Sequence, residues 1–161
     1  MKLLALSALL LALSAPKKKE PPPPVDPNVA VAKMYGGKVF ADEKAPASDG
    51  EALKSWLSSR PPVGEVGRKS KDGPWTVAYV AVFKKPAAKG PITVQFFDKE
   101  DPKNVVDQES PSNDAATLVY HGSYDLDPDR GFNKGRTYVI KVGQIIKGKF
   151  LPYATAELKL K

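Results

Sequence analysis

Cysteine is absent from this 161-residue chain, and histidine occurs only once, at His121. Without cysteine there is no disulfide, no thiolate nucleophile and no thiolate-ligated metal site. A single histidine excludes a metal site with two imidazole ligands and leaves one imidazole base. The G-x-S-x-G, G-x-G-x-x-G, P-loop and H-E-x-x-H motifs are also missing. These absences favour a protein that is not an enzyme.

The N-terminus has the pattern of a secretory signal peptide, which we predict over residues 1–15. Lys2 precedes the apolar run Leu3–Leu13, and the small residues Ser14 and Ala15 follow it. The run is too short for a spanning helix, which needs about 20 apolar residues. We therefore expect export to the periplasm or the medium, cleavage near Ser14/Ala15 and no transmembrane span after processing. The alternative is that the leader stays uncleaved as an anchor.

A proline-rich segment separates this leader from a single predicted domain. Residues 16–27 (PKKKEPPPPVDP) are half proline and contain three adjacent lysines, which predicts an extended Pro/Lys-rich linker. The remaining residues, 28–161, are enough for one domain. The chain is 42% hydrophobic, which suffices for a modest core.

Alternating apolar and polar residues predict about seven short strands in this domain. Segment 75–84 (WTVAYVAVFK) is apolar on both faces, which is typical of a strand buried on both sides. Segment 149–160 alternates, which predicts one buried and one exposed face. Val29–Tyr35 fits a further strand, and Lys147-Gly148 fits the turn of a hairpin.

One short helix is predicted over residues 49–58. Leu53 and Leu57 are four residues apart and share a helical face. Ser48 and Glu51 match a capping box, in which each side chain accepts a hydrogen bond from the other's exposed backbone N–H. The chain is therefore expected to be mainly β with this one helix.

Two aromatic residues suggest a particular β architecture. Tyr138 opens a strand after the glycine- and proline-rich stretch 127–135, which resembles the tyrosine corner of immunoglobulin-like domains. Trp75 on a central strand is similar to the core tryptophan of those domains. The resemblance covers two positions, lacks the disulfide cysteines and implies an immunoglobulin-like β-sandwich. It implies no activity.

Charge is unevenly distributed along the domain. Residues 98–129 carry nine acidic and two basic side chains, whereas residues 130–161 carry eight basic side chains and one acidic. The simplest interpretation is that strands of opposite charge pair with each other. Two separate functional patches are the alternative.

Three alternating carboxylates form the best candidate for a metal site. Asp125, Asp127 and Asp129 occupy alternate positions, as oxygen ligands of Ca²⁺ often do. Arg130 and Arg136 stand where an EF-hand loop needs glycine and glutamate, so that motif is not met. A calcium-stabilised structural domain is therefore an alternative to a solvated acidic loop.

His121, Ser123 and Asp125 have the residue types of a hydrolase triad. Alternate residues of one strand point to the same face, so these three are expected to share a face. Triad members normally converge from separate segments of the chain. A small secreted hydrolase using His121 is therefore a second alternative.

Basic and aromatic residues gather near the C-terminus. Lys141, Lys147, Lys149, Phe150 and Tyr153 are interleaved there, and the chain carries a net charge of +7. Such a surface attracts polyanions, and an exported protein does not meet nucleic acid as its usual partner. We therefore predict a non-catalytic binding module of the cell envelope without a cofactor. Its expected partner is an envelope protein or an anionic envelope polymer.

Overall fold

The structure is a computed structural model, and it describes residues 26–161 except 45–48, 62, 69 and 72. The predicted signal peptide, most of the predicted linker and the predicted capping residue Ser48 lie outside the described residues. The described part contains two α-helices, a short 3-10 helix and eight strands. They are α1 (Asn28–Tyr35), β1 (Lys38–Asp42), α2 (Gly50–Ser58), β2 (Val63–Val66), β3 (Trp75–Ala87), β4 (Thr93–Asp98), β5 (Asp101–Glu109), β6 (Thr117–Leu126), η1 (Pro128–Arg130), β7 (Thr137–Ile146) and β8 (Lys149–Leu160).

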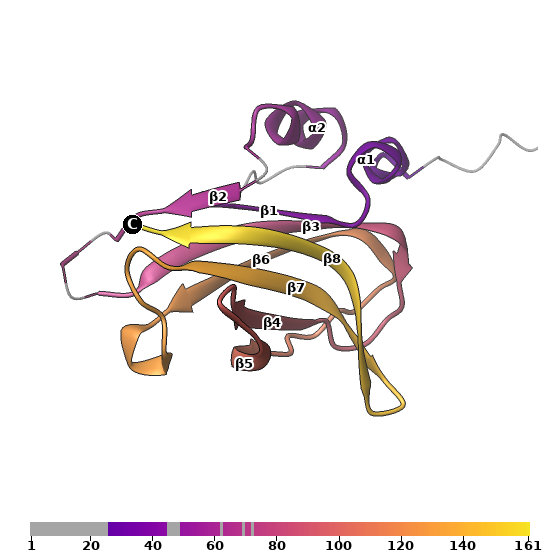
Figure 1. Ribbon diagram of the computed structural model, residues 1–161. Helices are drawn as coiled ribbons and strands as arrows, with labels where there is room; N and C mark the ends of the chain where they lie inside the picture. The colour runs from indigo at the N-terminus through magenta and orange to yellow at the C-terminus, as the bar shows by residue number, and fades with distance from the viewer. Residues whose placement is uncertain (1–25, 45–48, 62, 69, 72) are drawn as a thin grey trace, which may run out of the picture.

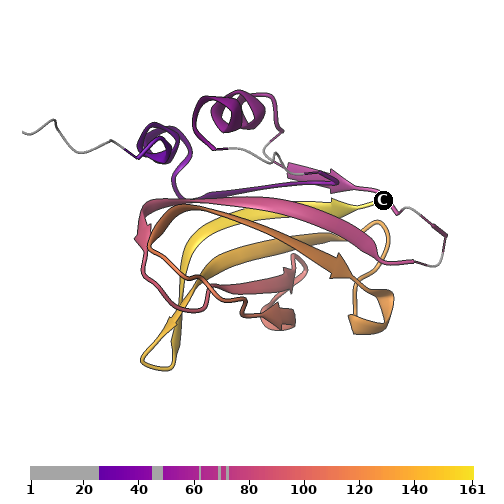
Figure 2. The same ribbon diagram turned by 180° about the vertical axis from the view of Figure 1, so that it is seen from behind.

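All eight strands belong to one mixed sheet. Seven of them follow the order β5-β4-β7-β8-β1-β3-β6, and β2 pairs separately with β8. The strands β1 and β2 run parallel to β8, whereas the other neighbours are antiparallel. Figures 1 and 2 show the sheet curling into a half-barrel, of which β5 and β6 are the two edges.

The prediction of a mainly β domain is confirmed, whereas the immunoglobulin-like sandwich of two packed sheets is not. Lys38 in β1 pairs with Thr155 in β8, and Val63–Val66 pairs with the end of β8. These parallel contacts join strands from both ends of the domain into one sheet. A sandwich and a curled sheet need the same alternation of buried and exposed residues. The alternation therefore could not distinguish them.

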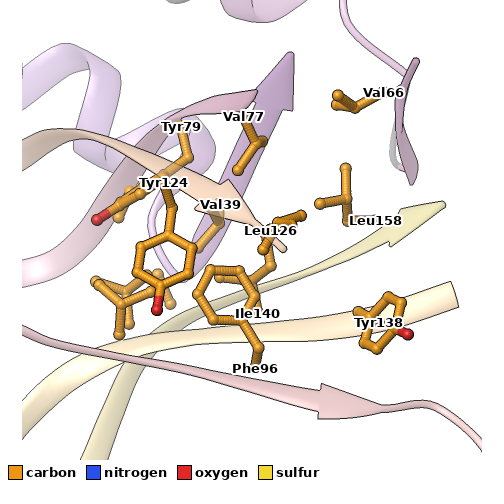
Figure 3. Close-up of a cluster of buried hydrophobic side chains, with 14 of the residues drawn as sticks. Val39, Val66, Val77, Tyr79, Phe96, Tyr124, Leu126, Tyr138, Ile140 and Leu158 are labelled. Atoms are coloured by element: carbon orange, nitrogen blue, oxygen red, sulfur yellow. The ribbon is translucent and has the colours of Figure 1, made fainter. Parts of the chain in front are cut away.

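The concave side of the sheet holds the main hydrophobic core. As the alternation predicted, β3 contributes Trp75, Val77, Tyr79, Ala81 and Phe83, all of them fully buried. Figure 3 shows how residues of other strands meet them, among them Phe96, Tyr124, Ile140 and Leu158.

The two helices cover the convex side of the sheet over β1 and β3 (Figures 1 and 2). Val31 of α1 and Leu53 and Leu57 of α2 belong to a second buried cluster with Val80 and Val82 of β3. The prediction that β3 is buried on both sides is therefore confirmed. The predicted helix over 49–58 is confirmed as α2, which begins at Gly50.

The prediction of a strand over Val29–Tyr35 is wrong, because these residues form most of α1. Val31 and Tyr35 are four residues apart and share a helical face, and the Tyr35 ring packs edge-on against Phe40 at 5.6 Å. In so short a segment, two valines in alternate positions are compatible with the two-residue period of a strand and also with the 3.6-residue period of a helix. Packing on the convex side of the sheet selects the helix, so the domain has two helices instead of the one predicted.

Both aromatic residues behind the predicted architecture are buried in the core. The Tyr138 hydroxyl donates to the Gly131 carbonyl at 3.2 Å and accepts from the Asn133 N–H at 2.8 Å. The Trp75 indole N–H donates to the Lys161 carbonyl at 2.8 Å. The hydrogen bond from the tyrosine hydroxyl to the backbone a few residues upstream, which is typical of a tyrosine corner, is thus present. The sheet nevertheless does not form a sandwich.

The predicted pairing of oppositely charged strands is wrong, because β5 and β6 of the acidic segment pair with β4 and β3, whereas β7 and β8 of the basic segment pair with neither β5 nor β6. The two segments meet instead through ion pairs at the end of the sheet near η1. Arg136 forms ion pairs with Asp98, at 2.8 Å, and with Glu100. Arg130 forms an ion pair with Asp107 at 2.7 Å. These ion pairs neutralise part of the negative charge of residues 98–129 and part of the positive charge of residues 130–161.

Candidate functional site

The five residues predicted to bind an anionic partner all lie on the hairpin of β7 and β8, but in two places. Lys141 and Tyr153 lie in the part of the hairpin that borders the rest of the sheet. Lys147, Lys149 and Phe150 lie at its far end, which extends beyond the sheet in Figures 1 and 2. The structure therefore brings only two of the five to the same hollow of the surface.

That hollow is a groove in which lysines of β3 and β7 surround an aromatic residue of β8. One part has a volume of about 460 Å³ and is lined by Lys84, Lys85, Pro86, Pro152 and Tyr153. The adjoining part, of about 410 Å³, shares three of these residues and adds Gly37, Lys141, Ala154 and Thr155. We call the two parts together the basic groove.

A glycine turn between α1 and β1 brings β3 and β8 together at this groove. The Gly37 N–H donates to the Val82 carbonyl of β3 at 2.8 Å, and its carbonyl accepts from the Thr155 N–H of β8 at 3.2 Å. Gly37 has φ of +92°, a conformation that side chains disfavour. A Cβ at Gly36 would lie 2.5 Å from the Ala32 carbonyl oxygen and 3.1 Å from the Lys84 Cα. The Gly-Gly sequence thus allows the close approach that places Lys84 beside Tyr153.

A buried amide fixes the base of the projecting hairpin. Gln144 is 6% exposed, and its side chain reaches the connection between β3 and β4. Its Oε1 accepts from the Ala88 N–H at 3.2 Å, and its Nε2 donates to the Ala88 carbonyl at 3.0 Å and to the Pro91 carbonyl at 3.4 Å. The Tyr153 hydroxyl donates to the same Oε1 at 3.3 Å. Gln144 therefore joins one residue of the basic groove to the base of the hairpin.

The basic groove keeps its positive charge. No ion pair within the described residues involves Lys84, Lys85 or Lys141. The Lys141 ammonium lies 4.0 Å from the centre of the Phe97 ring, a cation–π contact that leaves the charge uncompensated. An anionic group could therefore bind these lysines without an existing ion pair having to break first.

Sequence reasoning missed the two lysines of β3. Lys84 and Lys85 directly follow the apolar run of β3. This pattern indicated the end of a buried strand and gave no sign that Tyr153, 69 residues after Lys84, is a neighbour. Their place beside Tyr153 depends on β1, which pairs with β3 on one side and with β8 on the other. Only the strand order brings these segments together.

A second polar cluster lies between the two edge strands of the half-barrel. No backbone hydrogen bond among the described residues joins β5 to β6, and side chains join them instead. The Tyr124 hydroxyl donates to Asp107 Oδ2 at 2.6 Å, and the Tyr79 hydroxyl donates to Glu109 Oε1 at 3.3 Å. Arg130 donates to the other Asp107 oxygen at 2.7 Å. We call this cluster the tyrosine–carboxylate seam.

Burial keeps the phenols of Tyr79 and Tyr124 in the seam protonated. Burial, and then the negative charge of Glu109, raise the pKa of Tyr79 well above its usual range. Burial, followed by the hydrogen bond to Asp107, does the same to the pKa of Tyr124. Loss of water also raises the pKa of Glu109, although the hydrogen bond from Tyr79 opposes this change. The phenols therefore remain donors: Tyr124 joins the edge strand β6 to the edge strand β5, and Tyr79 joins β3 to β5.

The three residues of the possible hydrolase triad are exposed on β6, but the structure does not join them. His121 Nε2 lies 3.0 Å from Asp49 Oδ1 at the start of α2. Asp125 Oδ1 accepts from the Thr76 hydroxyl at 2.8 Å. Within the described residues no hydrogen bond links His121 to Ser123 or to Asp125.

Two of the three alternating carboxylates, Asp125 and Asp127, have local structural partners. Asp127 caps η1, because its Oδ1 accepts from the Asp129 N–H at 2.9 Å. Asp125 belongs to the preceding strand and bonds to Thr76 there. No group of three or more histidine, aspartate or glutamate side chains in the described part of the chain is placed to hold a metal ion.

Comparison with known proteins identifies no family. No protein-family pattern matches the chain, and no curated protein sequence matches it. Among solved structures, a superoxide reductase (neelaredoxin) from Ignicoccus hospitalis matches with 14% sequence identity and a TM-score of 0.35. The match covers 82% of this chain and 87% of that one. Neither described helix is long and apolar enough to cross a membrane.

Proposed function

We propose that this chain is an exported, non-catalytic binding module of the cell envelope whose basic groove holds an anionic polymer. The observation that carries the proposal is the meeting of Lys84, Lys85 and Lys141 around Tyr153. Their segments are far apart in the sequence. Export is supported by the N-terminal sequence pattern, with its short apolar run and small residues at the expected cleavage position.

The shape and chemistry of the groove favour a polymer over a single small anion. The groove consists of two adjoining open hollows, so a chain of repeating units could pass through both. Pro152 and Tyr153 provide an apolar floor on which the face of a sugar ring can pack. The surrounding ammonium groups would meet carboxylates or phosphates on the same polymer. An acidic glycan has both features, and so does a teichoic acid that carries sugar substituents.

Binding of labelled teichoic acid to the full chain tests this proposal. Fluorescence anisotropy at increasing salt would compare the wild type with the double variant Lys84→Glu, Lys85→Glu. Each lysine beside an anionic surface contributes about 1 kcal/mol, or roughly a fivefold change in affinity. We therefore expect the double charge reversal to weaken binding by at least about tenfold, and salt to weaken binding by the wild type.

The matched control is the double variant Lys103→Glu, Lys134→Glu, which changes the net charge equally. Both control residues are exposed and lie near the end of the sheet opposite the hairpin. This variant should lose less than about threefold, because it changes only the general attraction between protein and polymer. Equal losses in the two double variants, or binding that salt does not weaken, would contradict the proposed role of the groove.

A further inference from the structure

The far end of the β7–β8 hairpin is the most exposed apolar part of the described chain. Five large hydrophobic residues are exposed, and three of them lie here: Ile145 (51% exposed), Ile146 (43%) and Leu151 (43%). The other two, Met34 and Val105, lie on α1 and β5. Single exposed apolar residues are common on protein surfaces, whereas a group of them at the end of one projecting hairpin is unusual.

Both faces of this hairpin end carry apolar side chains, and one of them also carries Lys149, which is opposite Ile146 in the strand register. In the strand register Ile145 is opposite Phe150, and Gln144 is opposite Leu151. Opposite residues share a face and successive residues alternate, so Ile145 and Phe150 lie on one face, and Ile146 and Leu151 lie on the other. We call residues 145–151 the hairpin tip.

The hairpin tip has no neighbouring strand. Pairing of β7 with β4 ends at Gly143, and pairing of β8 with β1 is confined to Thr155. Figures 1 and 2 show the tip extending beyond the sheet from both sides of the molecule. Within the described residues, therefore, no other strand pairs with either outer edge of the tip, and the exposure of Ile145, Ile146 and Leu151 shows that its apolar side chains are largely uncovered.

The charges of the hairpin tip are all positive. Lys147 and Gly148 form the turn, both with positive φ (52° and 75°), and Lys149 follows them. The segment from 130 to the C-terminus contains only one acidic residue, Glu157, and that residue is paired with Lys99 at 2.7 Å. Lys147 and Lys149 thus lie at the turn itself, and the apolar residues lie directly behind them. Lysine side chains are long enough to reach back to a polar boundary while their apolar neighbours are buried.

We propose that the hairpin tip inserts into the interface of a membrane that carries anionic lipids. A fluid bilayer can surround an apolar tip on both faces at once, and its anionic headgroups match Lys147 and Lys149. The outer backbone edges of the tip have no strand partner, and such groups are not tolerated in the hydrocarbon core. Insertion is therefore shallow, at the level where headgroups meet acyl chains. This inference uses residues outside the basic groove and stands independently of polymer binding.

A fluorophore attached at the hairpin tip tests the inference directly in the full chain. Because the chain contains no cysteine, Ile146→Cys creates a unique site for an environment-sensitive nitrobenzoxadiazole label. Val105→Cys is the matched control, since Val105 is equally exposed and lies on an edge strand away from the tip. A probe at the tip reports insertion even if the apolar N-terminal run also binds lipid.

We expect a blue shift and a several-fold rise in emission for the tip label with phosphatidylcholine vesicles that contain phosphatidylglycerol. Spin-labelled lipids with the nitroxide near the headgroup should quench this emission more strongly than lipids labelled deep in the acyl chain. The control label should stay unchanged, and neutral vesicles should give little response at either position.

Three results would overturn the inference. The first is an unchanged tip label on anionic vesicles, which is also what a tip that fits only a protein partner would give. The second is an equal response of the two labels, and the third is an equal response to neutral vesicles. Urea unfolding of both labelled proteins, compared with the wild type, verifies that they fold. Failure of this test leaves teichoic acid binding by the basic groove unaffected, so the two proposals fail separately.

Discussion

Replacing Gln144 by leucine should destabilise the domain and loosen the base of the hairpin. Leucine has nearly the volume of glutamine, so the change removes hydrogen bonds without leaving a large cavity. The amide of Gln144 bonds to the Ala88 N–H, to the carbonyls of Ala88 and Pro91, and to the Tyr153 hydroxyl. In the variant the Ala88 N–H loses its partner in a site where Gln144 itself is 6% exposed.

The expected loss of unfolding free energy follows from these bonds. A typical hydrogen bond contributes about 0.5–1.5 kcal/mol, and a buried group left without a partner costs about 1–3 kcal/mol. Two of the four contacts of Gln144, both with Ala88, are 3.0 and 3.2 Å long, whereas those with Pro91 and Tyr153 are 3.4 and 3.3 Å. Burial of the more apolar leucine offsets part of the loss. We therefore expect a net decrease of about 2–3 kcal/mol.

Urea unfolding followed by circular dichroism measures this change. With a slope of about 2 kcal/mol per molar urea, the midpoint should fall by roughly 1 M. Gln108→Leu is the control, because Gln108 is exposed on β5 and its side chain bonds, among the described residues, only to the half-buried Gln95 amide, at 2.7 Å. That variant should stay within about 0.5 kcal/mol of the wild type. An equally small effect at Gln144 would refute the reasoning.

Three further variants test the core and the seam. Gly122→Ala should cost about 1–3 kcal/mol in urea unfolding, because a Cβ there would overlap the buried ring of Tyr79. In Glu109→Gln, stability relative to the wild type should increase as the pH rises above about 4. Burial raises the pKa of Glu109, so the wild type binds its proton more tightly when folded and loses stability as that proton leaves; a stability difference that does not change with pH would contradict this cause. Tyr138→Phe should lower the unfolding free energy by about 1–2 kcal/mol by removing the acceptor of the Asn133 N–H, and an unchanged urea midpoint would show that this bond contributes nothing.

Much of the local structure could be predicted from residue patterns. The apolar residues of segment 75–84 require burial on both faces, and β3 is covered by the main core on one side and by the helices on the other. The turn Lys147-Gly148 needs two residues with positive φ, and the structure has both. The failure at Val29–Tyr35 has a physical cause. Seven residues with two alternating valines satisfy either the helical or the strand period, and only the surface available for docking decides between them.

The candidate sites, too, could be predicted from the sequence only in part. The sequence marked Lys141 and Tyr153, because charge and aromatic character are visible in one segment. It could not indicate that Lys84 from β3 lies beside them, since this depends on β1 pairing with both β3 and β8. The tyrosine–carboxylate seam was invisible for the same reason, as it joins the first and last strands of the sheet order.

The sequence by itself determined the elements that short-range chemistry specifies: the alternating strands, the amphipathic helix α2, the hairpin turn and the excess of positive charge. It also determined that no thiol or paired histidine chemistry is available. The tertiary structure decided that one sheet curls instead of two sheets packing and which lysines share a groove. It also decided that residues 145–151 project without a neighbouring strand. The physical reason is that residue periodicity records whether a side chain is buried, whereas strand pairing determines which distant residue it meets.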